Sequence, residues 1–373
     1  MITIDNKSKC VGCAGCYSIC PKNCINMSDD NEGFKYPIVD EIKCINCNMC
    51  TKVCPVINPK TKPSLQKSYA AYNKDEDTRI NSSSGGLFAV FSKEVLSQGG
   101  VVFGAMFDES FNIVHGYIEN ENQLFKFQGS KYVQSSIGDT YKKCKEFLEQ
   151  NRLVYFTGAP CQINGLKNYL RKEYNNLLTQ DFVCHGVPSP KVWNDYKARF
   201  KKIENVSFRD KTNGWLDFHM KVNDYKSSHS KDPFMTAFLT NNILRPSCYE
   251  CKFKTKDRIS DITLADLWGA SNIVPEMDDD KGISLLVINS NKGLNLLEKV
   301  KSDLVMKEIS LDLSINYNSA YVKSVDMPKT RAKVMSQINQ NNFDGIVKKC
   351  SHQSFIVRCC NKCKRIIKRI IKK

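Results

Sequence analysis

The chain has 373 residues, of which 41% are hydrophobic and 18 are cysteines, and its formal net charge is +16. This length predicts two or three domains, the composition excludes a disordered or fibrous protein, and no nucleic-acid-binding motif accompanies the positive charge. The apolar stretches fall far short of the roughly 20 residues that cross a membrane, and residues 1–10 lack the apolar core of a secretion signal. We therefore expect a cytoplasmic protein whose cysteines bind metal or carry out redox chemistry, with no nucleic acid as a partner.

Residues 1–58 contain nine cysteines in two similar runs, and residues 59–68 form a polar, Pro-containing linker. Each run reads Cys-x2-Cys-x2-Cys-x3-Cys-Pro, the spacing of bacterial two-cluster ferredoxins, in which the fourth cysteine of a run ligates the other cluster. Zinc is the alternative, but zinc sites typically use two Cys-x2-Cys knuckles. We predict a dicluster domain with two [4Fe-4S] clusters, and we expect the remaining Cys24 to be a small buried residue. One cluster is assigned to Cys10, Cys13, Cys16 and Cys54, and the other to Cys20, Cys44, Cys47 and Cys50.

From residue 69 to about residue 325 the pattern alternates between strands and helices, which predicts an α/β domain with a mixed sheet. The expected fold class is thus α+β / α/β: a small ferredoxin-like domain (1–58), a mixed-sheet α/β domain (69–325) and a basic helical tail (326–373). The expected strands are 101–107, 113–118, 153–157, 177–183, 262–264 and 285–289, and the expected helices are 139–150, 161–171, 189–202 and 292–301.

Three loops of the α/β domain carry residues that suit a cofactor. Ser82–Gly86 opens an expected helix, where glycines and hydroxyls form an anion cradle for a pyrophosphate, although a simple N-cap explains the same residues. Thr157–Gln162 and Val183–Ser189 each join a strand to a helix, at the sheet edge where α/β proteins bind ligands. Cysteines in the last two loops, with a later Cys-x2-Cys motif, could converge on a third cluster; zinc or free thiols are the alternatives. These cysteines are Cys161, Cys184, Cys248 and Cys251.

Three residues of this domain are candidates for catalytic proton transfer. His185 could donate a proton to a reduced product, or it could simply hydrogen-bond near the cofactor. Asp266 and Asp261 flank an expected strand and could serve as acids, with capping or pairing to Arg209 as the alternative.

Eight stretches between residues 69 and 310, taken in their order, resemble the coenzyme F420 hydrogenase/dehydrogenase beta-subunit family, in which a ferredoxin-like front end is a common fusion. The stretches are Ser82–Gly86, Gln98–Gly104, Gly129–Ser135, Thr157–Leu166, Cys184–Ser189, Ser207–Asp210, Arg245–Cys251 and Ser260–Gly269. One departure is Ala265, where glycine is expected. Members of this family are flavoproteins with FAD beside a [4Fe-4S] cluster. The resemblance implies that Cys161, Cys184, Cys248 and Cys251 hold the third cluster and that Ser84, Gly85, Gly86, Ser130 and Lys131 contact FAD.

We therefore predict an iron–sulfur flavoprotein oxidoreductase that passes electrons from ferredoxin, or another low-potential donor, through the clusters to FAD and an organic substrate. The resemblance implies the deazaflavin coenzyme F420 as that substrate, or a precursor of cell-surface polysaccharide. The sequence has no Gly-x-Gly-x-x-Gly after a strand, which argues against NAD(P). The alternatives are a non-catalytic electron-transfer subunit that serves a partner enzyme, and a cluster-stabilised binding module without FAD.

Much of the positive charge lies at the C-terminal end, where residues 341–373 contain ten Lys or Arg and one acidic residue. Apolar residues recur at helical spacing between the cations of residues 356–370. This pattern favours either a peripheral contact with the inner face of the membrane or a packed helix with a solvated cationic end. Another cluster is disfavoured, because adjacent cysteines cannot easily face one metal. The cysteines concerned are Cys350, Cys359, Cys360 and Cys363.

Overall fold

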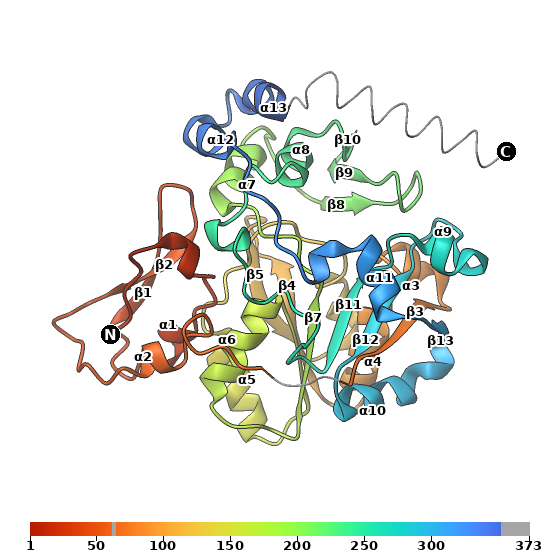
Figure 1. Ribbon diagram of the computed structural model, residues 1–373, viewed down its shortest axis with the longest axis horizontal. Helices are drawn as coiled ribbons and strands as arrows, with labels where there is room; N and C mark the ends of the chain where they lie inside the picture. The colour runs from red at the N-terminus through yellow and green to blue at the C-terminus, as the bar shows by residue number, and fades with distance from the viewer. Residues whose placement is uncertain (62–64, 352–373) are drawn as a thin grey trace.

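The structure is a computed structural model that describes residues 1–61 and 65–351 (Figure 1). The cysteine-rich N-terminal region lies at one side of the molecule, next to a large sheet that is covered by helices. No helix within residues 1–61 and 65–351 is long and apolar enough to cross a membrane. The amphipathic pattern predicted over residues 356–370 lies outside the described residues.

The N-terminal region is built from a hairpin and two short helices, each of which carries the third cysteine of its run. The hairpin strands pair antiparallel, and each helix begins after a residue with positive φ, Ala14 (57°) and Asn48 (58°). The two runs therefore turn in the same way. The elements are α1 (Gly15–Ile19), β1 (Ile25–Asp29), β2 (Lys35–Val39) and α2 (Met49–Lys52).

The central sheet has eight strands in the order β13-β3-β12-β11-β7-β6-β4-β5. Strands β4, β6, β7 and β11 run parallel in its middle, and antiparallel strands complete both sides. The predicted mixed α/β sheet is therefore confirmed. The strands are β3 (Lys67–Asn73), β4 (Val101–Phe107), β5 (Ile113–Ile118), β6 (Val154–Thr157), β7 (Leu177–Phe182), β11 (Ile262–Asp266), β12 (Ser284–Ile288) and β13 (Leu304–Glu308).

Helices pack on both faces of this sheet, because alternate side chains of the strands point to opposite sides. On β12, Leu286 and Ile288 join the core beneath α4 and α10, whereas Leu285 and Val287 join the core beneath α11. Helices α5 and α6 cover the second face at the β4–β6 side. The helices are α3 (Glu76–Ile80), α4 (Leu87–Ser97), α5 (Thr140–Glu149), α6 (Pro160–Leu170), α9 (Ala270–Ile273), α10 (Asn291–Val300) and α11 (Leu311–Tyr317).

A smaller three-stranded sheet, of order β10-β9-β8, lies beside the large one and packs against four helices (Figure 1). Its core centres on the buried Trp193 and Phe234, and it also contains Phe34 and Tyr36 of the N-terminal hairpin. The start of the predicted helical tail packs here too, through Val334. The elements are α7 (Pro190–Lys197), β8 (Val206–Asp210), β9 (His219–Val222), β10 (Tyr225–Ser228), α8 (Pro233–Leu239), α12 (Arg331–Gln337) and α13 (Phe343–Ser351).

Candidate functional site

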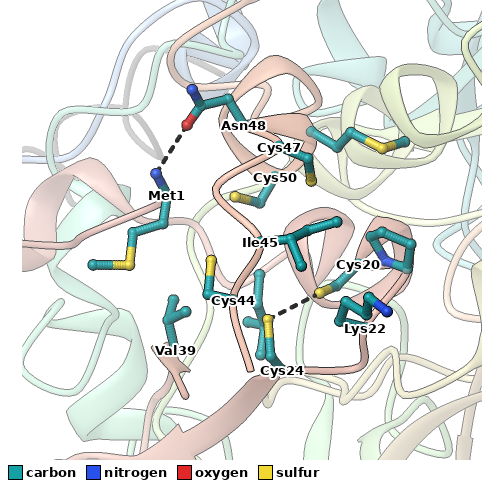
Figure 2. A pocket seen from close by; sticks show the side chains of 13 residues that line it. Met1, Cys20, Lys22, Cys24, Val39, Cys44, Ile45, Cys47, Asn48 and Cys50 are labelled. Carbon is teal, nitrogen blue, oxygen red and sulfur yellow. Dashed lines mark hydrogen bonds between the residues drawn. The ribbon is translucent and has the colours of Figure 1, made fainter. Parts of the chain in front are cut away.

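Four cysteines from both runs line one cavity of the N-terminal region (Figure 2). Cys44, Cys47 and Cys50 come from the second run and Cys20 from the end of the first, around an empty volume of about 350 Å³. Cys47 is exposed, so this outer cavity faces solvent. Cys24 is buried, as the sequence predicts, but it also lines the cavity, and its Sγ lies 3.3 Å from the Sγ of Cys20.

The other four predicted ligands line a second cavity, again of about 350 Å³. Burial, together with repulsion from the neighbouring Cys10 and Cys54 thiols, raises the pKa of the Cys13 thiol to about 12. Gly12 has a φ of +67°, and a Cβ there would stand 2.7 Å from Nε2 of Gln134, so this inner cavity packs directly on the second part of the chain. Each cavity thus takes three cysteines from one run and one from the other. The inner cavity is lined by Cys10, Cys13, Cys16 and Cys54.

A third group of thiols lies in the α/β domain. Cys161 is the second residue of α6, Cys184 follows β7, and Cys248 ends a short 3-10 turn. Burial and repulsion from Cys251 raise the pKa of Cys184 to about 12 and that of Cys248 to about 11. Burial likewise raises the pKa of Cys161, and the other three thiols raise it further. The structure therefore brings these four predicted ligands together.

The inner cavity and the third group adjoin each other, because α1 packs against α6. The Cys13 thiol is among the charges that act on Cys161. A Cβ on Gly165 of α6 would stand 2.9 Å from the Cβ of Cys13, so the absence of a side chain at Gly165 allows the close approach. The two sites are thus neighbours across the boundary between the N-terminal region and the α/β domain.

The first two thiol sets fit iron–sulfur clusters. Within residues 1–61 and 65–351, no group of three or more His, Cys, Asp or Glu side chains is arranged around a single metal ion. Four thiols instead surround each cavity, which is the donor set that a [4Fe-4S] cluster takes. Thiols whose pKa is raised must lose a proton to become ligands, and a bound metal supplies the positive charge that makes this favourable.

The two segments predicted to contact FAD lie side by side. Ser130 Oγ donates a hydrogen bond of 2.7 Å to Ser83 Oγ and so joins the two loops. Lys131 Nζ donates to the carbonyl oxygens of Gln128 and Gly129, at 2.8 and 3.2 Å. Burial lowers the pKa of Lys131 to about 7, so part of its charge is lost near neutral pH.

The first loop of the proposed FAD site has no side chain that caps α4. Gly86 is the N-cap of α4, with a φ of 83°, and it offers no side chain to cap the first turn, which suits an anion cradle. Ser84 and Gly85 instead form hydrogen bonds with the segment at the start of β12. Ser84 Oγ donates to the Ile283 carbonyl oxygen at 2.8 Å, and the Gly85 N–H donates to Ser284 Oγ at 3.0 Å.

Two of the candidate proton donors, His185 and Asp266, are held by other side chains. His185 Nε2 lies 2.6 Å from Asn241 Oδ1, and burial lowers the pKa of the imidazole, so the ring is neutral near pH 7. Asp266 accepts a hydrogen bond of 2.5 Å from Arg209 Nη1. The structure therefore shows the hydrogen-bonding alternative for His185 and the pairing alternative for Asp266.

Two cations beside the thiols were not predicted from the sequence. Lys254 lies close to the third group and donates to the His185 carbonyl oxygen. Arg245 reaches Cys10 of the inner cavity. Arg245 lies three residues before the Cys-x2-Cys motif and Lys254 lies three residues after it. That spacing alone does not indicate where their side chains point.

Together, the crossed thiol sets and the mixed sheet define an iron–sulfur protein with a small cluster-binding region in front of an α/β domain. Residues 9–58 match the 4Fe-4S dicluster domain, and residues 151–314 match the family described as the C terminus of the coenzyme F420 hydrogenase/dehydrogenase beta subunit. The chain thus contains a segment similar to the C terminus of this beta subunit, preceded by a segment similar to a 4Fe-4S dicluster domain.

The fold is also similar to that of a solved chain from the F420-reducing [NiFe] hydrogenase complex of Methanosarcina barkeri. The two chains are 15% identical, with a TM-score of 0.51 over 71% of this chain and 91% of that chain. At this identity the likeness establishes the fold alone. No curated relative matches the chain.

Proposed function

We propose that this protein is an iron–sulfur flavoprotein oxidoreductase that holds three [4Fe-4S] clusters and FAD and passes electrons between a carrier protein and an organic substrate. The observation that carries the proposal is the packing of α1 against α6, the helix that carries Cys161: a Cβ on Gly165 of α6 would stand 2.9 Å from the Cβ of Cys13 in the inner cavity. If no electrons passed between the ferredoxin-type region and the α/β domain, the thiols of the inner cavity would not need to lie beside the third thiol group.

The proposed ligands are the outer set, the inner set and the group formed by Cys161, Cys184, Cys248 and Cys251. When bound, such clusters carry single electrons, and a flavin exchanges single electrons for pairs. The protein keeps the outer set open to solvent at Cys47 and buries the inner set against the third. This order supports an electron donor, such as ferredoxin, that docks at the outer cavity.

The proposed FAD site is the joined pair of loops at residues 82–86 and 129–131. The open first turn of α4 and the Lys131 amine suit the pyrophosphate of FAD, because both attract an anion. The proposed substrate is a deazaflavin coenzyme or a polysaccharide precursor. His185, neutral near pH 7, is our candidate for positioning a proton at the product.

The second candidate function is an electron-transfer subunit without a substrate of its own. The solved hydrogenase chain is part of a hydrogenase complex, and that setting favours this candidate. The isolated chain would then bind the other subunits of a partner enzyme, and it would reduce no small organic acceptor when supplied with an artificial reductant. Turnover by the isolated chain separates the two functions.

The first experiment is anaerobic purification followed by measurement of iron, sulfide and flavin per chain. About 12 iron atoms with one FAD support the full proposal, because each [4Fe-4S] cluster contributes four. About 8 iron atoms without flavin contradict it, because redox chemistry would then be confined to the dicluster domain.

A peripheral membrane contact of residues 356–373 is tested by deleting these residues. Unchanged membrane association of the shortened chain contradicts the contact.

A further inference from the structure

Arg245 is a fully buried cation at the boundary between the N-terminal region and the α/β domain. Its Nε donates to the Cys10 carbonyl oxygen at 2.8 Å, and its Nη1 donates to Gln134 Oε1 at 2.9 Å. Its Nη2 donates to the Lys35 carbonyl oxygen at 3.0 Å and to Cys10 Sγ at 3.6 Å. The guanidinium therefore places an N–H donor on a thiol that lines the inner cavity.

The partners of Arg245 differ from those of other buried arginines in this chain. Arg79, Arg209 and Arg331 each pair with a carboxylate. The hydrogen bonds of Arg245 go instead to carbonyl oxygens, a side-chain amide and a thiol, and its guanidinium lies 4.3 Å from the ring centre of Tyr36. Burying a charge without a counter-charge is strongly unfavourable, so such a cation implies an anion nearby.

The thiols around Arg245 can provide that anion once they are deprotonated. Arg245 Nη2 donates to Cys10 Sγ of the inner set, and the backbone N–H of Cys248, in the third group, donates to the Arg245 carbonyl oxygen at 2.9 Å, so Arg245 contacts a residue of each thiol site. Gly12 confirms the close fit, because a Cβ there would stand 2.9 Å from Arg245 Nη1.

We propose that Arg245 is a positioning residue that raises the reduction potential of the cluster assigned to Cys10, Cys13, Cys16 and Cys54. The inference rests on the proposed function, because it requires a cluster at the inner cavity. Reduction adds a negative charge to a cluster, and a buried cation that also donates to a ligand sulfur stabilises that added charge. Removing the cation makes reduction harder and moves the midpoint potential to a more negative value.

The test is a reductive titration of the anaerobically purified full chain, followed by the EPR signals of the reduced clusters. Arg245→Met removes the charge but retains a long, unbranched side chain, whereas Arg245→Lys keeps the charge. Arg331→Met is the matched control, since Arg331 donates to the Leu244 carbonyl oxygen and pairs with Glu32 of the N-terminal hairpin. It therefore loosens the same boundary without removing a thiol contact.

We expect Arg245→Met to move at least one midpoint potential to a more negative value, Arg245→Lys to lie closer to the wild type, and Arg331→Met to keep the wild-type potentials. Unchanged potentials in an iron-replete Arg245→Met protein would overturn the inference, as would an equal shift in Arg331→Met. Should Arg245→Met not retain its iron, Arg245→Gln takes its place in the comparison. Iron content of the wild type decides the proposed function separately: a wild type without iron at the inner set refutes that function, whatever the variants do.

Discussion

The ion pair between Arg209 and Asp266 allows a test of whether Asp266 maintains structure or performs chemistry. The two side chains are 3% and 18% exposed, and Arg209 Nη1 lies 2.5 Å from Asp266 Oδ2. Three rings, those of Trp215, Phe218 and Trp268, surround the guanidinium with centres 4.9–5.5 Å from its central carbon. Asp266→Ala therefore leaves a buried cation among aromatic rings without its carboxylate.

Breaking a buried ion pair costs about 3–5 kcal/mol. Because Asp266 is 18% exposed, we expect Asp266→Ala to lower the free energy of unfolding by roughly 2–3 kcal/mol. At roughly 1.3 °C per kcal/mol for a chain of 373 residues, the thermal midpoint should fall by roughly 3–4 °C. The assay is thermal unfolding followed by circular dichroism, with all variants iron-loaded and heated at one scan rate. The double variant Arg209→Met/Asp266→Ala should recover at least half of the loss, because no unpaired charge remains.

A loss below about 0.5 kcal/mol would refute this reasoning, because that is the size of an ordinary surface change. A double variant as unstable as the sum of the two single variants would refute it as well. Asp266→Asn supplies the comparison with chemistry. If this variant keeps the wild-type thermal midpoint but loses all turnover, Asp266 acts as an acid in the reaction.

Three further predictions concern the cofactor sites. Cys161→Ala should lower the iron content from about 12 to about 8 atoms per chain. Cys144→Ala, at a buried thiol outside the three sets, should leave the iron content unchanged, and iron and sulfide assays decide this. FAD affinity, measured by flavin fluorescence, should be highest below about pH 7, where Lys131 is an ammonium, and should fall by up to about tenfold per pH unit above it; Lys131→Met should abolish this slope. Gly12→Ala should cost at least about 1–2 kcal/mol of stability for its left-handed φ and should reduce iron loading at the inner cavity, whereas Gly345→Ala, where a Cβ meets nothing within 4 Å, should do neither.

The large sheet could be predicted from the sequence because its strands are apolar and its helices amphipathic. Strands β4 and β5 have the predicted bounds, 101–107 and 113–118; β6 and β7 differ from the predictions by one residue at one end, and β12 is shifted by one residue at both ends. The helix predicted over residues 189–202 ends at Lys197, because Phe200 is only partly buried and its neighbours are polar and exposed. Hydrophobic periodicity and composition therefore predicted the positions of the helices and strands more accurately than their first and last residues.

The small sheet could not be predicted, because its strands have only four or five residues and its core comes from distant segments. Phe208 of β8 packs with Trp193 of α7 and Phe234 of α8, and no local pattern pairs them. The adjacency of Ser83 and Ser130 likewise depends on the tertiary fold. Asp261 shows the same limit: it is buried and accepts hydrogen bonds from Thr179, a role that its place beside a strand does not reveal.

The spacing of the cysteines could group them into two sets, but it could not show whether the dicluster region folds independently of the rest of the chain. A free-standing domain buries its own apolar residues, yet Phe34 and Tyr36 of the N-terminal hairpin are buried in the core of the small sheet. Glu32 pairs with Arg331, nearly three hundred residues away in the sequence. Excised from the chain, residues 1–58 would expose these aromatic rings to water and lose the cation at the inner cavity. The thiols of the inner set therefore depend on the α/β domain for their surroundings, and the two parts of the chain are best regarded as one redox unit.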